Sequence, residues 1–216
     1  MHGMNEKAPP SDHNATEKPP RNAYHHGDLR AALIEHTRRL VEEKGPDHFS
    51  VSEVARCAGV STAAPYRHFR DRDEILAEVC IAGMRRHYSQ MINALKDVPK
   101  GSLERLRGLG RVYVQFAQEE PGVFRLIFGS KQKPDSVEEL KSEDIDTYGL
   151  VKAEVAEILG LPAEHPEANR RAFMLWTFVH GLSFLIIDDN VRYAGIPIDV
   201  EALLDELGQR VMRDLA

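Results

Sequence analysis

Apolar residues recur along almost the whole chain at the three- and four-residue spacing of helices that bury one face. The first such face comprises Leu29, Leu33, Thr37, Leu40 and Val41. No segment alternates apolar and polar residues over the length of a half-buried strand. The pattern therefore predicts an all-α protein of about nine helices.

The boundaries of these helices follow from capping and breaking residues. Gly45 and Pro46 end the first helix, and Ser50 with Glu53 forms a capping box that opens a short second helix ending at Ala58. A third helix is expected from about residue 61 to 69, and the segment Arg-Asp-Arg-Asp-Glu at 70–74 opens a long fourth helix. The remaining helices are expected at 102–119, 121–129, 136–159, 166–188 and 199–214. Ser136 with Glu139, and Asp199, supply further caps.

Composition changes this picture only at the N-terminus. Residues 1–22 contain two Pro-Pro pairs and almost no aliphatic side chains, so we expect a disordered tail without the apolar centre of a signal peptide. The most apolar stretch elsewhere, WTFVHGLSFLII, is short and interrupted by polar residues, so no membrane span is expected. Cys57 and Cys80 fall at apolar helix positions, which favours buried, reduced thiols and a cytoplasmic location.

Charge is distributed unevenly along the chain. The formal net charge is −6, yet residues 21–72 hold nine Lys and Arg against seven Asp and Glu. A mildly basic N-terminal piece thus precedes an acidic remainder. This asymmetry suggests a nucleic-acid-binding module attached to a body with another role.

The three short helices before residue 70 have the outline of a helix-turn-helix. The segment Ala58-Gly59-Val60-Ser61 joins the second and third of them. Gly59 permits a tight reversal, and Val60 can fill the angle between the two helices. Pro65 is tolerable only within the first turn of the third helix, because backbone N–H groups there have no intrahelical acceptor.

The stretch FSVSEVARCAGVSTAAPYRHFRDRDEIL resembles the DNA-binding signature of TetR-type transcriptional regulators. The likeness covers about residues 24–80, and WTFVHG at 176–181 resembles the subgroup named for a Trp-His-Gly motif. The resemblance implies a helix-turn-helix DNA-binding domain at 23–71 and a helical ligand-binding and dimerisation domain at 72–216. It further implies a homodimeric repressor that binds a palindromic operator, needs no cofactor, and is released by a small-molecule effector.

The resemblance also assigns roles to residues of the helix-turn-helix. The start of a recognition helix enters the major groove, so Thr62, Ala63 and Ala64 are expected at base edges. The positions that match phosphate contacts of the family are Tyr66, His68 and Arg72, and Ser52 is a further candidate. Pro65 departs from the aliphatic residue usual in the family.

In the body, the resemblance implies an effector pocket and a dimer interface. The aromatic and polar-tipped candidates for the pocket are Tyr88, Tyr113, Phe116, Phe124, Phe128, Trp176 and His180, each of which could equally be an ordinary core residue. Helix 166–188 is apolar on nearly all sides and must be covered on all sides, which favours a second chain. The interface candidates are Phe178, Leu182, Leu185, Leu203, Leu204, Leu207 and Val211.

Two other classes of function compete with a regulator. A small-molecule-binding helical enzyme would need a catalytic constellation, but the sequence offers only HHGD at 25–28 and His180 near Asp188 and Asp189, without a third residue at metal-ligand spacing. A sequence-independent nucleic-acid binder would need a long basic stripe, whereas this body is acidic. We therefore expect neither a catalytic nor a metal site.

Overall fold

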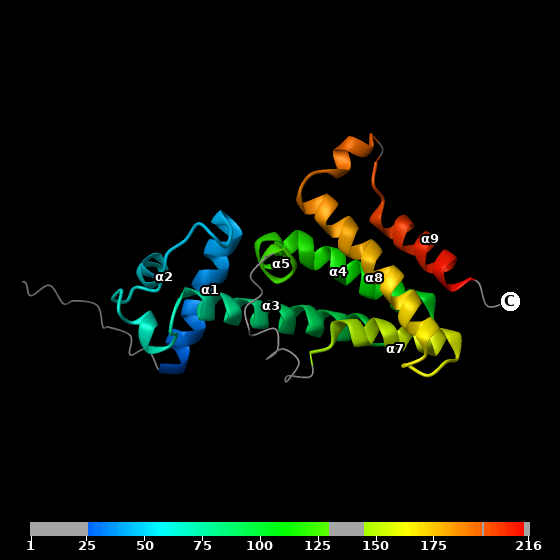
Figure 1. The fold of residues 1–216 in the computed structure, drawn as a ribbon, viewed down its shortest axis with the longest axis horizontal. Coiled ribbons are helices and arrows are strands. Elements are labelled where there is room, and N and C mark those ends of the chain that lie inside the picture. The colour runs from blue at the N-terminus through cyan, green and yellow to red at the C-terminus, as the bar shows by residue number, and fades with distance from the viewer. Residues whose placement is uncertain (1–25, 130–144, 196, 214–216) are drawn as a thin grey trace, which may run out of the picture.

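The computed structural model describes residues 26–129, 145–195 and 197–213, and within them it contains only helices and their connections (Figure 1). The all-α prediction is confirmed. In chain order the elements are α1 (His26–Lys44), α2 (Val51–Cys57), the 3₁₀ helix η1 (Pro65–Arg67), α3 (Arg72–Ala94), α4 (Leu103–Glu119), α5 (Pro121–Phe128), α7 (Thr147–Leu159), α8 (Pro166–Ile187), the 3₁₀ helix η2 (Val191–Ala194) and α9 (Val200–Met212).

Short polar side chains set where several helices begin. Ser50, Asp71 and Asp199 each accept a hydrogen bond from the backbone N–H three residues later, at the starts of α2, α3 and α9. Only one of the two hydrogen bonds of the capping box at α2 forms, from the Glu53 N–H to the Ser50 hydroxyl. The Glu53 carboxylate binds Lys44 and not the backbone N–H of Ser50. The predicted start of α2 is nevertheless confirmed.

The prediction of a third α-helix is wrong, because the segment contains only a short 3₁₀ helix. Residues 61–69 form turns around the single 3₁₀ turn η1. Pro65 has no N–H to donate to the Ser61 carbonyl, which is instead bound by the Ala64 N–H at 2.9 Å. The His68 N–H then bonds the Pro65 carbonyl at 2.9 Å, another three-residue step. The proline thus favours 3₁₀ turns over an α-helix in this segment.

The predicted helix at 136–159 is confirmed only in its second half. α7 starts at Thr147, because the Asp146 side chain accepts the Gly149 N–H at 2.6 Å and caps a new N-terminus. The capping box of Ser136 and Glu139 lies outside the described residues, as does the N-terminal tail. Gly160, with φ of +62°, ends α7 in the left-handed conformation expected at a helix C-terminus.

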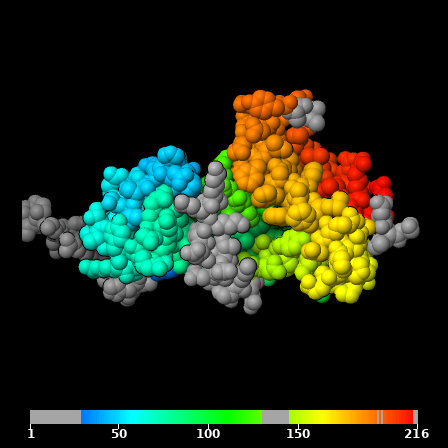
Figure 2. Space-filling view, viewed as in Figure 1, coloured from blue at the N-terminus to red at the C-terminus, as the bar shows by residue number. Residues whose placement is uncertain are grey.

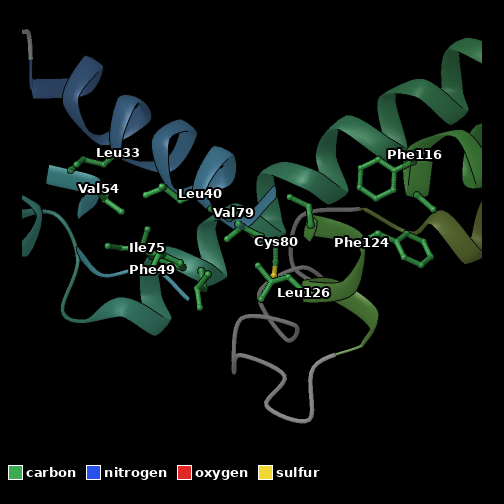
Figure 3. Close-up of a cluster of buried hydrophobic side chains, with 14 of the residues drawn as sticks. Leu33, Leu40, Phe49, Val54, Ile75, Val79, Cys80, Phe116, Phe124 and Leu126 are labelled. Atoms are coloured by element: carbon green, nitrogen blue, oxygen red, sulfur yellow. The ribbon is translucent and has the colours of Figure 1, made fainter. Parts of the chain in front are cut away.

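One hydrophobic core runs from the N-terminal elements into the body. Leu33 and Leu40 of α1 meet Val54 of α2 and Ile75 of α3, and the same cluster continues through Val79, Cys80 and Leu126 to Phe116 and Phe124 (Figure 3). The helix-turn-helix segment is therefore not packed as a separate unit. α1 and α2 lie at one end of the molecule and α9 at the other (Figure 1).

Helix α8, which contains the apolar stretch noted in the sequence, is 22 residues long. By length and composition alone it would suit a membrane span; it packs against α4, α7 and α9, and 33% of its most apolar part is buried. The expectation that both cysteines are buried is half wrong, because Cys80 is buried whereas Cys57 is exposed near the end of α2.

Candidate nucleic-acid interface and ligand cavity

The connection between α2 and η1 has the hydrogen bonds of a Schellman motif. The Val60 N–H bonds the Ala55 carbonyl at 3.0 Å, and the Gly59 N–H bonds the Arg56 carbonyl at 3.1 Å. Gly59 has φ of +68°, a conformation that side chains with a Cβ rarely adopt. Val60 is half-buried against the core. The sharp reversal expected of a helix-turn-helix is therefore present.

Most of the candidate DNA-contacting residues lie on the surface of this turn. Ser52, Thr62 and Ala63 are exposed, whereas Ala64 and His68 are half-buried. Tyr66 is 57% exposed, although tyrosine usually buries much of its ring. Pro65 and Phe69, which alternate with these residues, are buried and anchor the segment to the core.

Arg72 is less available than the sequence suggests. Its guanidinium donates to the Pro46 carbonyl and lies over the Phe49 ring, with Cζ 4.6 Å from the ring centroid. These contacts tie the start of α3 to the loop between α1 and α2. Arg30 is similarly engaged, since it pairs with Glu78 at 2.6 Å and lies over Phe69. Both arginines therefore make contacts that stabilise the packing of the helix-turn-helix.

A cavity opens in the body between five helices. The cavity has a volume of about 40 Å³, within about 590 Å³ of empty space that includes the part open to solvent. The walls are formed by Met91, Leu106, Arg107, Leu109, Gly110, Tyr113, Thr147, Tyr148, Val151, Leu175, Trp176, Val179, Leu204, Leu207 and Gly208. A mainly apolar lining with few polar groups is typical of small-molecule sites.

Only Tyr113 and Trp176 of the candidate effector residues line this cavity. Phe116 and Phe124 are fully buried in the core, and Tyr88 is half-buried on α3. The remaining two, Phe128 and His180, are outside the lining and contact each other, with ring centroids 5.2 Å apart. The candidates chosen from the sequence therefore identify an aromatic cluster, of which only two members line the cavity.

His180 connects that aromatic cluster to the cavity wall. Its Nδ1 and the Tyr113 hydroxyl share a hydrogen bond of 2.8 Å, and its ring lies 5.1 Å from that of Trp176. Burial lowers the pKa of His180, because an imidazolium would lose its hydration here. Burial likewise raises the pKa of Tyr113. The pair is therefore neutral near pH 7 and behaves as a polar bridge, not as an acid or base.

Sequence reasoning missed most of the cavity lining, including its one charged residue. Arg107 lies on the otherwise apolar face of α4 that also carries Leu106, Gly110 and Tyr113. A cation within an apolar helical stripe is a signal that the sequence contained. The contributions of Thr147 and Tyr148 depend on how α7 packs, which no local pattern indicates.

A polar joint links α1 to the start of α5. The Glu42 carboxylate accepts the Gly122 and Val123 N–H groups at 2.8 and 2.9 Å, which caps α5 from another helix. A Cβ at Gly122 would lie 2.6 Å from the Val41 carbonyl oxygen, so glycine permits this close approach. Next to it, Arg86 of α3 donates to both oxygens of Glu120 at 2.8 and 2.5 Å.

The candidate dimer residues differ in where they face. Leu182 and Leu204 are buried within the chain itself, and Phe178, Leu203, Leu207 and Val211 are half-buried, whereas Leu185 is 48% exposed. The residues Phe173, Thr177, Gly181 and Leu185, four apart along α8, are all exposed. This stripe lies on a helix that forms part of the surface toward the viewer in Figure 2.

Two family models match this chain. One, described as bacterial regulatory proteins of the tetR family, matches residues 33–79, and the other, a tetracyclin repressor-like C-terminal domain, matches residues 106–211. Together they cover more than half of the sequence. The chain therefore belongs to the tetR family, a class of DNA-binding transcriptional regulators. The likeness of WTFVHG to the Trp-His-Gly subgroup stays a prediction.

Solved structures and curated proteins also resemble this chain. A protein of unknown function from Rhodococcus sp. RHA1 is 28% identical with a TM-score of 0.75, over 91% of this chain and 100% of that one. A tetR-family regulator from Streptomyces coelicolor is 15% identical with a TM-score of 0.67, over 87% and 80%. The nucleoid occlusion factor SlmA of Vibrio vulnificus (strain YJ016) is 29% identical over 46% of this chain and 51% of its own length. This chain thus spans about half the length of such curated relatives.

Proposed function

We propose that the protein is a cytoplasmic repressor that binds a two-fold symmetric operator as a homodimer and releases it when a small molecule enters the body. The observation that carries the proposal is the continuous hydrophobic cluster that joins the helix-turn-helix to residues of the apolar cavity in the body. A regulator needs these two sites and a physical link between them. An enzyme would need a catalytic group at the cavity, but the described lining offers only neutral hydroxyls, an indole and one arginine.

The proposed DNA contacts follow from exposure on the turn. Thr62 can donate to or accept from a base edge, and Ala63 and Ala64 allow close approach or contact thymine methyl groups. Tyr66 and His68 would bind phosphates, which position the protein without reading sequence. Ser52 at the start of α2 would add another backbone contact. Arg72 lies over the Phe49 ring and would bind a phosphate from that position.

The proposed dimer covers the exposed stripe of α8. A second copy could pack its own Phe173, Thr177, Gly181 and Leu185 against the same stripe about a two-fold axis, with α9 alongside. Gly181 has no atom within 4 Å of a Cβ position, so a partner helix can approach closely there. Two helix-turn-helix surfaces would then meet half-sites about one helical turn, roughly 34–36 Å, apart.

The proposed coupling runs through α5. Its rings Phe124 and Phe128 contact Tyr113 and His180 beside the cavity, while its N-terminus is held by Glu42 of α1. A ligand that moves Tyr113 or Trp176 would shift α5 and, through Glu42, the orientation of α1. To weaken operator binding a hundredfold, the ligand must prefer the released conformation by about 2.7 kcal/mol.

A selection experiment tests the function. Purified protein is mixed with fragmented genomic DNA from the source organism, and the bound fragments are sequenced. We expect enrichment of a palindromic sequence, protected as two half-sites by two chains. Fragments without a common sequence would contradict an operator-specific role and favour sequence-independent binding.

A further inference from the structure

We infer that the cavity takes an amphipathic monocarboxylate, with its apolar part among the inner residues and its carboxylate on Arg107. The inference rests on the proposed function, since it names the chemical class of the effector. It depends on three features of the cavity: the depth of its apolar part, the position of its polar groups and the loose pairing of its single cation.

The inner wall of the cavity is apolar. Met91 is 1% exposed, Leu109 is 2% exposed and Tyr113 is 5% exposed, with the Tyr113 hydroxyl already bound to His180. The other deep contributors, Val179 and Leu204, are also buried. A charged group placed there would lose its hydration without gaining a partner. The ligand part that reaches this depth must therefore be hydrocarbon.

Apart from the Tyr113 hydroxyl, which His180 already binds, the polar groups of the lining belong to residues that are only half-buried. Arg107 and Thr147 are half-buried, in contrast to the inner residues. The Tyr148 hydroxyl, also on a half-buried residue, donates to Asn169 at 3.0–3.1 Å. The polar end of a ligand must therefore lie beside these half-buried residues, and Arg107 is the one charged residue of the described lining.

Arg107 is held less firmly than its neighbours on α4. Arg105 donates to both oxygens of Glu154 at 2.6 and 2.7 Å, and Arg111 makes a two-pronged contact with Glu201. Arg107, by contrast, reaches Glu104 only at 3.4 Å and Asp205 only at 3.5 Å. Charge-assisted bonds are normally about 2.7–2.9 Å long. Arg107 thus keeps donors that a ligand can use.

The Nε of Arg107 supports the same conclusion. It is buried and has no hydrogen-bond partner among the described residues. A buried donor without an acceptor is costly, and a carboxylate, whose two oxygens match the guanidinium fork, would satisfy it. A cation attracted by Glu104 and Asp205 would leave Nε unpaired and bring two like charges together. The geometry therefore favours an anion over a cation.

Trp176 offers a direct readout of binding, because it is the only tryptophan of the chain and lines the cavity. Its fluorescence is titrated at pH 7.5 with decanoate, 1-decanol and decyltrimethylammonium, three probes that share a chain and differ in head group. We expect decanoate to bind about tenfold more tightly than decanol, as a charge-assisted bond exceeds a neutral one. The ammonium probe should bind more weakly than both.

A pair of matched variants assigns this preference to Arg107. Arg107→Met keeps a chain of similar length without charge and should reduce the decanoate-to-decanol ratio to about one. Arg111→Met, one turn further along α4 and also facing α9, removes an arginine outside the cavity and should keep the wild-type ratio. In the wild type, each methylene added from octanoate to decanoate should tighten binding about fourfold if it is fully buried.

Several results would overturn the inference. These are tighter binding of decanol or the ammonium probe, no binding of any probe, or a ratio that Arg111→Met changes as much as Arg107→Met. The head-group ranking uses the wild-type protein, so it stands even if a variant fails to fold. Operator binding is titrated separately without probe. Its absence would contradict the proposed repressor while leaving the head-group ranking unaffected.

Discussion

Gly59 and Pro65 control the backbone of the residues that would meet DNA. Gly59 takes the left-handed conformation that ends α2, and Pro65 prevents the α-helical bond to the Ser61 carbonyl. The residues between them, Thr62 to Ala64, therefore lie on a tight turn rather than on a full helix. Because two of these three are alanines, direct base contacts should be few, and DNA shape should carry part of the specificity.

The first prediction separates base from phosphate contacts. Thr62→Val removes a hydroxyl and keeps the shape, so it should weaken operator binding by about 1–3 kcal/mol per disturbed base pair and leave random DNA unaffected. Tyr66→Phe should weaken both duplexes equally, because phosphates carry no sequence information. Neither change removes a cation, so the slope of log affinity against log salt should stay constant. Titrations against operator and scrambled duplexes decide between the two roles; equal losses for Thr62→Val would exclude it from base contact.

The second prediction concerns His87, which is fully buried between the rings of Tyr113 and Phe116. Its ring nitrogens have no hydrogen-bond partner in the described structure, and burial lowers its pKa from 6.5 to about 4. Between these two pH values the unfolded chain binds a proton that the folded chain does not. The contribution of neutral His87 to the free energy of unfolding is therefore fully present above pH 6.5. It is lost as the pH falls from 6.5 toward 4.

Urea unfolding of wild type and His87→Met at several pH values measures this effect. From pH 7 to pH 4 the wild type should lose up to about 3 kcal/mol more unfolding free energy than the variant, in which this group no longer titrates. Comparing the two proteins cancels the contributions of the carboxylates they share. Parallel pH profiles would show that His87 is not the buried neutral group described here.

Among the elements, α5 holds the position between the two candidate sites. It is only eight residues long, so its stability depends on contacts made by other helices. Its N-terminus is capped by Glu42 of α1 and its rings pack beside the cavity. A short helix fixed at both ends by different parts of the molecule can transmit a displacement from one part to the other.

The third prediction tests this cap. Glu42→Gln removes the charge and replaces one acceptor with a donor, so it should lower the unfolding free energy by about 1–2 kcal/mol. Hydrogen exchange should accelerate at the amides of Gly122 and Val123. Glu43→Gln, the exposed neighbour, is the matched control and should change neither quantity. If both variants behave alike, Glu42 does not hold α5.

At this scale, local pattern predicted most of the fold. Caps such as Asp199 and breakers such as Gly45 and Pro46 placed the ends of the helices within a few residues. The third helix was wrongly predicted as an α-helix, because its pattern was helical while one residue, Pro65, lacked the N–H that an α-helical bond needs. The cavity could not be found because it is formed by side chains from five helices, and the packing of α7 and α9 against α4 is not encoded in any one segment.

For the whole molecule, the proposed recognition of a two-fold symmetric operator requires two copies of the chain. The fourth prediction is that the wild type has twice the chain mass in light scattering and that Phe173→Glu with Leu185→Glu gives a folded monomer, because charges would be buried at the proposed interface. Ile92→Glu changes a similarly exposed apolar residue on α3 and should remain dimeric. A monomeric wild type, or a double variant that still dimerises, would exclude the α8 stripe as the interface.

Operator recognition by a dimer is tested by a footprint of the protein on the DNA fragment that it selects most strongly. A dimeric repressor should protect two half-sites related by two-fold symmetry, with centres one helical turn or a multiple apart, and two chains should be bound per site. Thr62→Val should lose this footprint at concentrations that still give non-specific binding. A single asymmetric protected region, or uniform protection independent of sequence, would contradict the claim that this helix-turn-helix reads an operator as a dimer.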